Sequence, residues 1–155
     1  MSNADKAVIL LVEDNEGDIV LTQVAMREAK LANELLIARD GDEALDILFK
    51  RNGFEDAPIP DLVLLDLNLP KTDGHEVLAT MKASDELRWI PVVVLTTSES
   101  DSDRIKSYNL HANCFVSKPL KASSFVRVVQ EIESFWLSIV CLPPNPLKSR
   151  STKHG

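Results

Sequence analysis

A short aliphatic run, Leu62-Val-Leu-Leu65, is the feature that most restricts how this chain can fold. An aspartate precedes the run, Asp66 follows it, and a proline and Gly74 turn the chain soon afterwards. A wholly apolar run of this length is typical of a strand buried on both faces, as in a parallel sheet covered by helices. Open α/β sheets bind ligands at the carboxyl ends of their strands, so we expect Asp66 to stand at a binding crevice.

Strand-like and helix-like patterns alternate along the whole chain. Apolar runs predict strands at Ala7–Val12, Glu34–Ala38, Asp61–Asp66, Ile90–Thr96 and Asn113–Ser117. Apolar residues at helical spacing predict helices at 17–30, after Gly41, and at 74–83, 100–110 and 122–139, with a loop at 52–60. Five alternations without a repeat or a linker predict one α/β domain. Its expected architecture is a doubly wound, flavodoxin-like parallel sheet of five strands in the order 2-1-3-4-5.

Length and charge narrow the class of protein. The 155 residues suit a single core, which we place at 7–142, between an N-terminal arm at 1–6 and a flexible tail at 143–155. The net charge of −7 argues against binding to nucleic acid or to an anionic membrane. No signal region or membrane-length apolar segment is present, and the two cysteines sit singly among apolar residues, so we expect a reduced, cytoplasmic protein.

Acidic residues end two of the predicted strands. Glu13 and Asp14 follow the first strand and Asp66 ends the third, and the predicted strand order places these two ends side by side. Clustered carboxylates repel each other unless a cation lies among them, and an all-oxygen set suits Mg²⁺ or Mn²⁺. We expect Asp14, Asp66 and the backbone carbonyl of Asn68 to bind the ion, with Glu13 acting through water.

The fourth and fifth predicted strands end in Thr96 and Lys118 at the same sheet edge. A carboxylate surrounded by a metal ion, a hydroxyl and an ammonium is arranged for phosphoryl transfer, with Asp66 as the nucleophile. Glycoside hydrolysis by paired acids is the alternative, but it needs a sugar cleft with aromatic platforms, and only 5% of the residues are aromatic.

Glu13-Asp14, Asp66, Thr96 and Lys118-Pro119, taken in this order, resemble the receiver domain of two-component response regulators. The resemblance extends from about residue 7 to residue 139, and the intervals from Asp66 to Thr96 and to Lys118 match those of chemotaxis-type, CheY-like receivers. It implies a phosphoacceptor signalling protein rather than an enzyme. Such a protein phosphorylates itself on Asp66, in a magnesium-dependent reaction, from the phosphohistidine of a sensor histidine kinase.

The resemblance also implies roles for individual residues. Lys118 would pair with the phosphoryl group, Thr96 would move in to bind it, and Phe115 would be the rotating switch aromatic. Glu13 stands where an aspartate is commoner, and Thr97 stands where a small residue is usual, which would narrow access to the phosphoryl group. The long loop at 52–60 and the C-terminal residues look like those of the single-domain regulators that partner cyanobacterial and bacterial phytochromes.

Apolar residues near the C-terminus allow two interpretations. They could finish the core by folding back over the sheet edge, or they could form an exposed patch that makes a homodimer. We favour the dimer, because one small domain can hardly bury every side of one helix. The candidate interface residues are Phe135, Trp136, Leu137, Val140 and Leu142.

Two alternative functions stay open at this point. A pseudo-receiver would keep the fold as an interaction module and never carry a phosphoryl group. A haloacid-dehalogenase-type phosphatase also uses an aspartate nucleophile at a strand end, but it needs a second acid two residues later, where this chain has Asn68. The three histidines have no metal-ligand spacing and are expected at the surface or in turns.

Overall fold

The structure is a computed structural model that describes residues 6–29, 32–96, 112, 114–118 and 121–136, with the side chain of Thr96 excluded. The strands in this part of the chain are β1 (Ala7–Val12), β2 (Asn33–Ala38), β3 (Leu62–Leu65), β4 (Val92–Thr96) and β5 (Cys114–Ser117). The helices are α1 (Glu16–Arg27), α2 (Gly41–Leu48), α3 (Gly74–Ala83) and α5 (Ala122–Ser134). The predicted helix at 100–110 lies outside the described residues.

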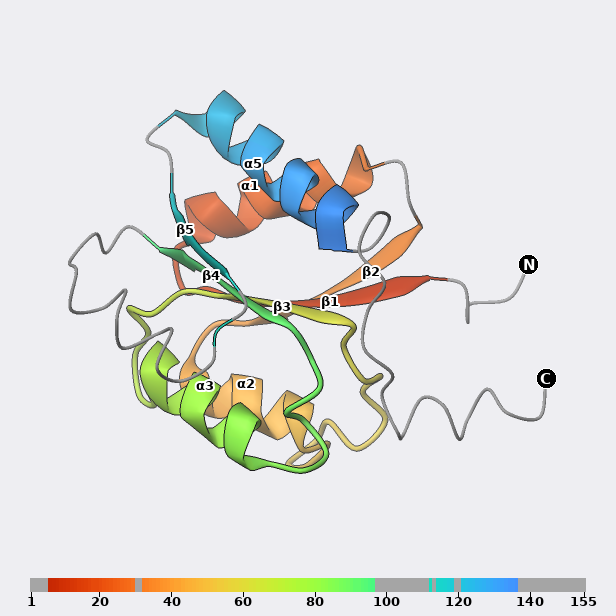
Figure 1. The fold of residues 1–155 in the computed structure, drawn as a ribbon, viewed down its shortest axis with the longest axis vertical. Helices are drawn as coiled ribbons and strands as arrows, with labels where there is room; N and C mark the ends of the chain where they lie inside the picture. The colour runs from red at the N-terminus through yellow and green to blue at the C-terminus, as the bar shows by residue number, and fades with distance from the viewer. Residues whose placement is uncertain (1–5, 30–31, 97–111, 113, 119–120, 137–155) are drawn as a thin grey trace.

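The strands form one parallel sheet in the order β2-β1-β3-β4-β5, as predicted from the sequence. Figure 1 shows α1 and α5 against one face of the sheet and α2 and α3 against the other. The doubly wound fold is therefore confirmed, and its switch point lies between β1 and β3. The last helix, predicted to reach residue 139, has its α-helical part end at Ser134.

Alternation along the strands divides the core into two clusters. Leu10, Val63 and Val94 belong to the cluster under α2 and α3, whereas their neighbours Leu64 and Val93 belong to the cluster under α1 and α5. Successive side chains of a strand point to opposite faces, so strands covered on both sides must be apolar throughout. This requirement explains the unbroken aliphatic runs in the sequence.

Each of the first three helices begins at a polar residue that caps it. The side chains of Asn15, Asp40 and Asp73 accept hydrogen bonds from backbone N–H groups in the first turns of α1, α2 and α3. Such caps satisfy amide groups that lack a partner within the helix, and each is worth about 1 kcal/mol.

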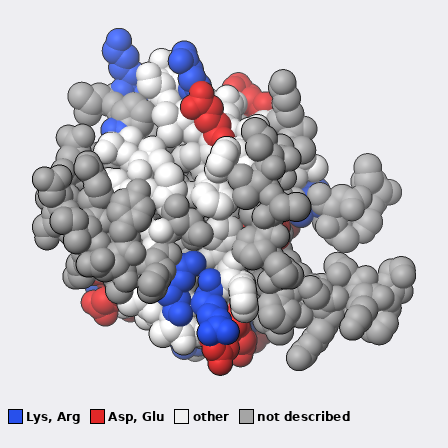
Figure 2. All heavy atoms as spheres, in the orientation of Figure 1, with Lys and Arg blue, Asp and Glu red and all other residues white. Residues whose placement is uncertain are grey.

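On the face drawn in Figure 2, the coloured charged side chains lie toward the helical layers, and uncharged atoms fill the middle.

The strand register brings the ends of β1 and β3 level. Val12 pairs with Leu65, and the N–H of Asp66 donates to the carbonyl of Val12 at 3.0 Å. The N–H of Glu13 donates to Ala38 on the opposite side at 2.9 Å. Glu13 and Asp66 are thus the first residues past two neighbouring strands.

None of the described helices is both long and apolar enough to cross a lipid bilayer.

Candidate functional site

Three carboxylates meet where β1 and β3 end. One oxygen from each of Glu13, Asp14 and Asp66 lies within 4.8 Å of the other two. Glu13 and Asp66 are buried, whereas Asp14 is exposed. The structure therefore confirms the prediction that these three acids lie close together at the switch point. The cluster opens to solvent on the Asp14 side, which leaves room for water or for a further ligand.

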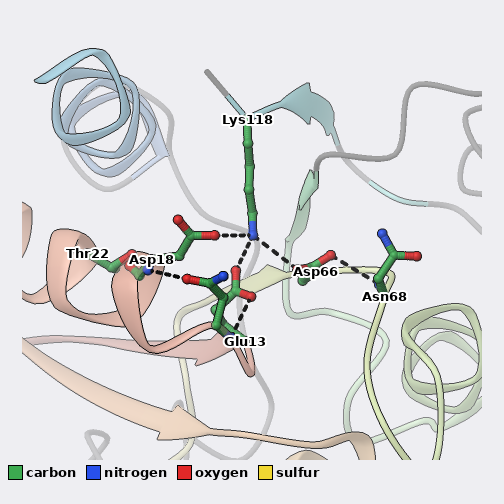
Figure 3. A network of polar contacts seen from close by, with 7 residues as sticks. Glu13, Asp18, Thr22, Asp66, Asn68 and Lys118 are labelled. Carbon is green, nitrogen blue, oxygen red and sulfur yellow. Dashed lines mark hydrogen bonds and ion pairs between the residues drawn. The ribbon is translucent and has the colours of Figure 1, made fainter. Parts of the chain in front are cut away.

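Lys118, which follows β5, reaches into this cluster with its ammonium group. Figure 3 shows the side chain between Glu13, Asp18 and Asp66. Its Nζ lies 2.8 Å from Asp18 Oδ2 and 3.0 Å from Asp66 Oδ2, and it also bonds Glu13 Oε1. Only 4% of the Lys118 side chain is exposed. A buried cation with this many anionic partners partly offsets the repulsion within the acidic cluster.

Asp18 is a member of this network that the sequence analysis missed. It lies in the first turn of α1, where its backbone N–H donates to Asn15 Oδ1 at 2.9 Å. An acid in the first turn of a helix has an ordinary explanation, namely favourable interaction with the helix dipole, so the position of Asp18 in the sequence does not by itself indicate a role at the site. The sequence carries no separate signal for the contact with Lys118, because the rotation of the first turn of α1 against the sheet decides where the Asp18 carboxylate points.

Burial shifts the proton affinities of this network. Burial raises the pKa of Glu13 from 4.5 to about 7, although the bond to Lys118 lowers it, and the charge of Asp66 adds to the rise. For Lys118, burial alone would lower the pKa, but the bonds to Asp18 and Glu13 outweigh it and hold the pKa above its usual value. The ammonium is therefore charged at every physiological pH.

The turn after Asp66 is tied to the phosphoacceptor candidate itself. The N–H of Asn68 donates to Asp66 Oδ1 at 3.0 Å, which orients the carboxylate. Gly74 approaches so closely that a Cβ atom there would lie 2.5 Å from the carbonyl oxygen of Asp66. The glycine therefore lets α3 begin directly against the backbone that carries Asp66.

The same turn rests on the beginning of α2. The hydroxyl of Thr72 donates to Asp42, and Lys71 Nζ lies 3.6 Å from Asp40 Oδ2. At Gly41, a Cβ atom would lie 1.7 Å from the carbonyl oxygen of Thr72, so no side chain fits there without movement of the backbone. Two loops that both lie at the carboxyl edge of the sheet are thus in direct contact.

Of the two predicted switch residues, the structure describes one in full. Phe115 lies on β5, is partly buried and packs against the cluster under α2 and α3. The backbone of Thr96 ends β4, in register with Ser117, but its side chain lies outside the described part of the structure, as do Thr97, Leu137, Val140 and Leu142. Of the dimer candidates, Phe135 is 48% exposed, and Trp136 is half-buried against the cluster under α1 and α5.

The donors present suit a small hard cation. Glu13, Asp14 and Asp66 supply only oxygen atoms, and the cluster has a solvent-exposed member, as an ion that retains water ligands requires. Glu13 and Asp66 each engage Lys118 through one carboxylate oxygen. The remaining oxygens accept backbone N–H bonds from Asn15 and Asn68, which fixes the direction of both carboxylates. The residues therefore fit Mg²⁺ or Mn²⁺.

This fold, with an acidic cluster and a lysine at the switch point, defines a class of signalling protein. The chain matches the model of the response regulator receiver domain over residues 9–130 and belongs to that family. It is 49% identical over 142 residues to the response regulator Rcp1 of Synechocystis sp., a match that covers 92% of this chain and 96% of Rcp1.

Solved structures of response regulators share the fold. The Mn²⁺-bound form of Rcp1 superposes with a TM-score of 0.85 at 48% identity, covering 89% of this chain and 99% of that one. The phosphorylated cyanobacterial phytochrome response regulator RcpA has a TM-score of 0.87 at 46% identity, covering 90% and 99%. The family prediction made from five strand-end residues is therefore confirmed.

Proposed function

We propose that this receiver accepts a phosphoryl group on Asp66 from the phosphohistidine of a sensor histidine kinase. The observation that supports this assignment best is the position of Asp66, which is buried at the switch point within 3.0 Å of the Lys118 ammonium. A carboxylate beside a fixed cation and two further acids is built to receive an anionic group together with a metal ion.

In the proposed reaction, a carboxylate oxygen of Asp66 forms a bond to phosphorus. The phosphorus–nitrogen bond of the donor breaks, and its electron pair returns to the imidazole, which takes up a proton from solvent. The Lys118 ammonium stabilises the negative charge on the transferred oxygens. Because Asn68 N–H holds Asp66 Oδ1, the attacking carboxylate is already oriented before the donor arrives.

We assign the metal site to Asp14, Asp66 and the backbone carbonyl of Asn68, with Glu13 acting through water. When bound, Mg²⁺ or Mn²⁺ would neutralise the charge on the phosphoryl oxygens. The similar structure of Rcp1 is that of its Mn²⁺-bound form, which supports this assignment. Thr96 and Phe115 are proposed as the switch pair, since they lie on the two strands next to β3 on the side of Lys118.

Signalling would then proceed by protein contact. RcpA is described as a phytochrome response regulator, and we propose a phytochrome-type kinase as the partner of this chain as well. We further propose a cytoplasmic location and a homodimer that uses the apolar residues from Phe135 onward. The exposure of Phe135 supports the homodimer. The packing of Trp136 on the core also agrees with the alternative, in which the segment folds back over the sheet edge.

Incubation with acetyl phosphate and Mg²⁺ tests the phosphoacceptor role directly. Intact mass spectrometry should show the gain of one phosphoryl group on the natural chain and no gain on Asp66→Asn. The matched control is Asp73→Asn, which replaces another aspartate at the same edge that caps α3 and does not contact Lys118. Absence of any gain over a wide range of Mg²⁺ concentrations would favour the pseudo-receiver.

A further inference from the structure

The Lys118 ammonium has three N–H donors, and three carboxylates from three different elements accept them. Glu13 follows β1, Asp18 lies on α1 and Asp66 follows β3. An ammonium group has no other polar atoms, so these contacts use its full hydrogen-bonding capacity. Figure 3 shows Asp18 and Asp66 on different sides of the nitrogen.

The direction of the third N–H depends on the other two. The donors of an ammonium are arranged tetrahedrally, so two fixed bonds determine where the remaining donor points. Glu13 and Asp18 hold two of the donors, and the third points at Asp66. When a phosphoryl group is added to Asp66, the contact between its carboxylate and Lys118 must change, and without Asp18 the bond to Glu13 would then be the one contact of these three left to hold the nitrogen.

We propose that Asp18 is a positioning residue that directs the Lys118 ammonium toward the phosphoryl group on Asp66. The proposal rests on the phosphoacceptor role of Asp66. Asp18 would act through Lys118 alone and not on the metal ion. In keeping with this, the set of acids in the described chain whose oxygens lie close enough to share an ion comprises Glu13, Asp14 and Asp66.

Asp18 is held firmly enough to serve this purpose. Its N–H is bonded to Asn15, and its carbonyl accepts the hydroxyl of Thr22 at 2.8 Å, so the backbone of Asp18 is fixed on both sides. Its side chain is 23% exposed, whereas that of Lys118 is 4% exposed. A contact to a buried ammonium with three anionic partners differs from a solvated surface pair, which contributes little to order or to energy.

The test compares Asp18→Asn, Asp18→Ala and Asp18→Glu with a matched control, Glu16→Gln. The control removes one charge from the same helical turn, but Glu16 pairs with Arg39 and has no contact with Lys118. Phosphorylation by acetyl phosphate is followed over a range of donor concentrations, and Mn²⁺ affinity is measured separately by electron paramagnetic resonance.

We expect the maximal rate to fall about tenfold in Asp18→Ala and less in Asp18→Asn, with partial recovery in Asp18→Glu. The donor concentration at half-maximal rate and the Mn²⁺ affinity should change less than about twofold. Glu16→Gln should match the natural chain. A maximal rate in Asp18→Ala equal to that of the control, whether or not the melting temperature falls, would overturn the proposal.

A second measurement separates this proposal from the phosphoacceptor assignment. The immobilised ammonium of Lys118 should give a resolved proton–nitrogen correlation signal in the unphosphorylated protein, and this signal should broaden or disappear in Asp18→Ala but persist in Glu16→Gln. If the natural chain takes no phosphoryl group, the assignment of Asp66 fails, while the correlation signal still decides the role of Asp18. Persistence of the signal in Asp18→Ala would refute positioning.

Discussion

The Nζ atom of Lys118 lies 3.0 Å from Oδ2 of Asp66, although 52 residues and a whole strand separate them. Because β4 lies between β3 and β5, the lysine must extend across the end of β4 to make this contact. A long, unbranched side chain with a charge at its tip meets that requirement. The pair therefore connects the phosphoacceptor candidate to the strand that carries Phe115.

Replacement of Lys118 by methionine, which has a similar shape, should remove the ammonium and leave Glu13 and Asp66 buried without their cation. Loss of one partner from a buried charge network costs about 3 kcal/mol. In metal-free buffer that contains a chelator, the free energy of unfolding should therefore fall by that amount. A divalent cation should restore part of the loss. Chemical denaturation with and without Mg²⁺ measures both effects, and equal losses in the two conditions would contradict the prediction.

Gly41→Ala should disturb the turn after Asp66. The added methyl group would overlap the Thr72 carbonyl, so the turn must move, and overpacking of this kind costs about 1–3 kcal/mol. Because Asn68 lies on the same turn, we also expect weaker Mn²⁺ binding. The control is Gly17→Ala on α1, where the nearest atom to a Cβ is Asn15 Oδ1 at 3.2 Å and a helical alanine is favoured. Equal melting temperatures and Mn²⁺ affinities for the two variants would exclude this coupling.

The raised pKa of Glu13 makes stability depend on pH. Burial raises that pKa to about 7 in the folded protein from 4.5, so the folded state binds the proton more tightly than the unfolded state between these values. Stability without metal should therefore fall as the pH rises from about 4.5 to about 7. In Glu13→Gln, the melting temperature should change less across this range.

Metal binding should show the opposite trend with pH. The negative charge of ionised Glu13 favours a cation nearby, even through water, so Mg²⁺ affinity should increase as the pH rises through about 7. Titration calorimetry on either side of this pH measures the change. An affinity that does not vary with pH, or a variation that survives in Glu13→Gln, would assign the dependence to another group.

Phe135→Glu tests the homodimer with less risk to folding than a change at Trp136. Phe135 is exposed and meets Trp136 edge to face at 5.6 Å between ring centroids, whereas Trp136 itself packs on the core. If the patch makes a dimer, sedimentation velocity should show a dimer for the natural chain and a monomer for Phe135→Glu. Val20→Glu, on the exposed face of α1, is the control. A natural chain that sediments as a monomer would favour the folded-back alternative.

The fold could be predicted from the sequence because each strand contains a short apolar run, and a polar residue ends or follows each run. The sequence was enough to predict that four site residues lie close together, because parallel strands share one carboxyl edge; these residues are Glu13, Asp14, Asp66 and Lys118. Asp18 could not be predicted in this way, because its contact depends on how the first turn of α1 is rotated against the sheet. That rotation is set by packing and capping, and no residue pattern in the chain specifies it on its own.

Because Gly74 lies so close to the backbone of Asp66, the two loops on either side of β3 should tolerate inserted or deleted residues to different degrees. The segment from 67 to 73 connects two backbone positions so close that a Cβ atom at Gly74 would overlap the carbonyl oxygen of Asp66, so an added or deleted residue in this segment would pull the start of α3 away from that carbonyl. The loop at 52–60 enters β3 from its other end, away from the acids. New residues, and with them new binding surfaces, can be acquired there without altering the chemistry at Asp66.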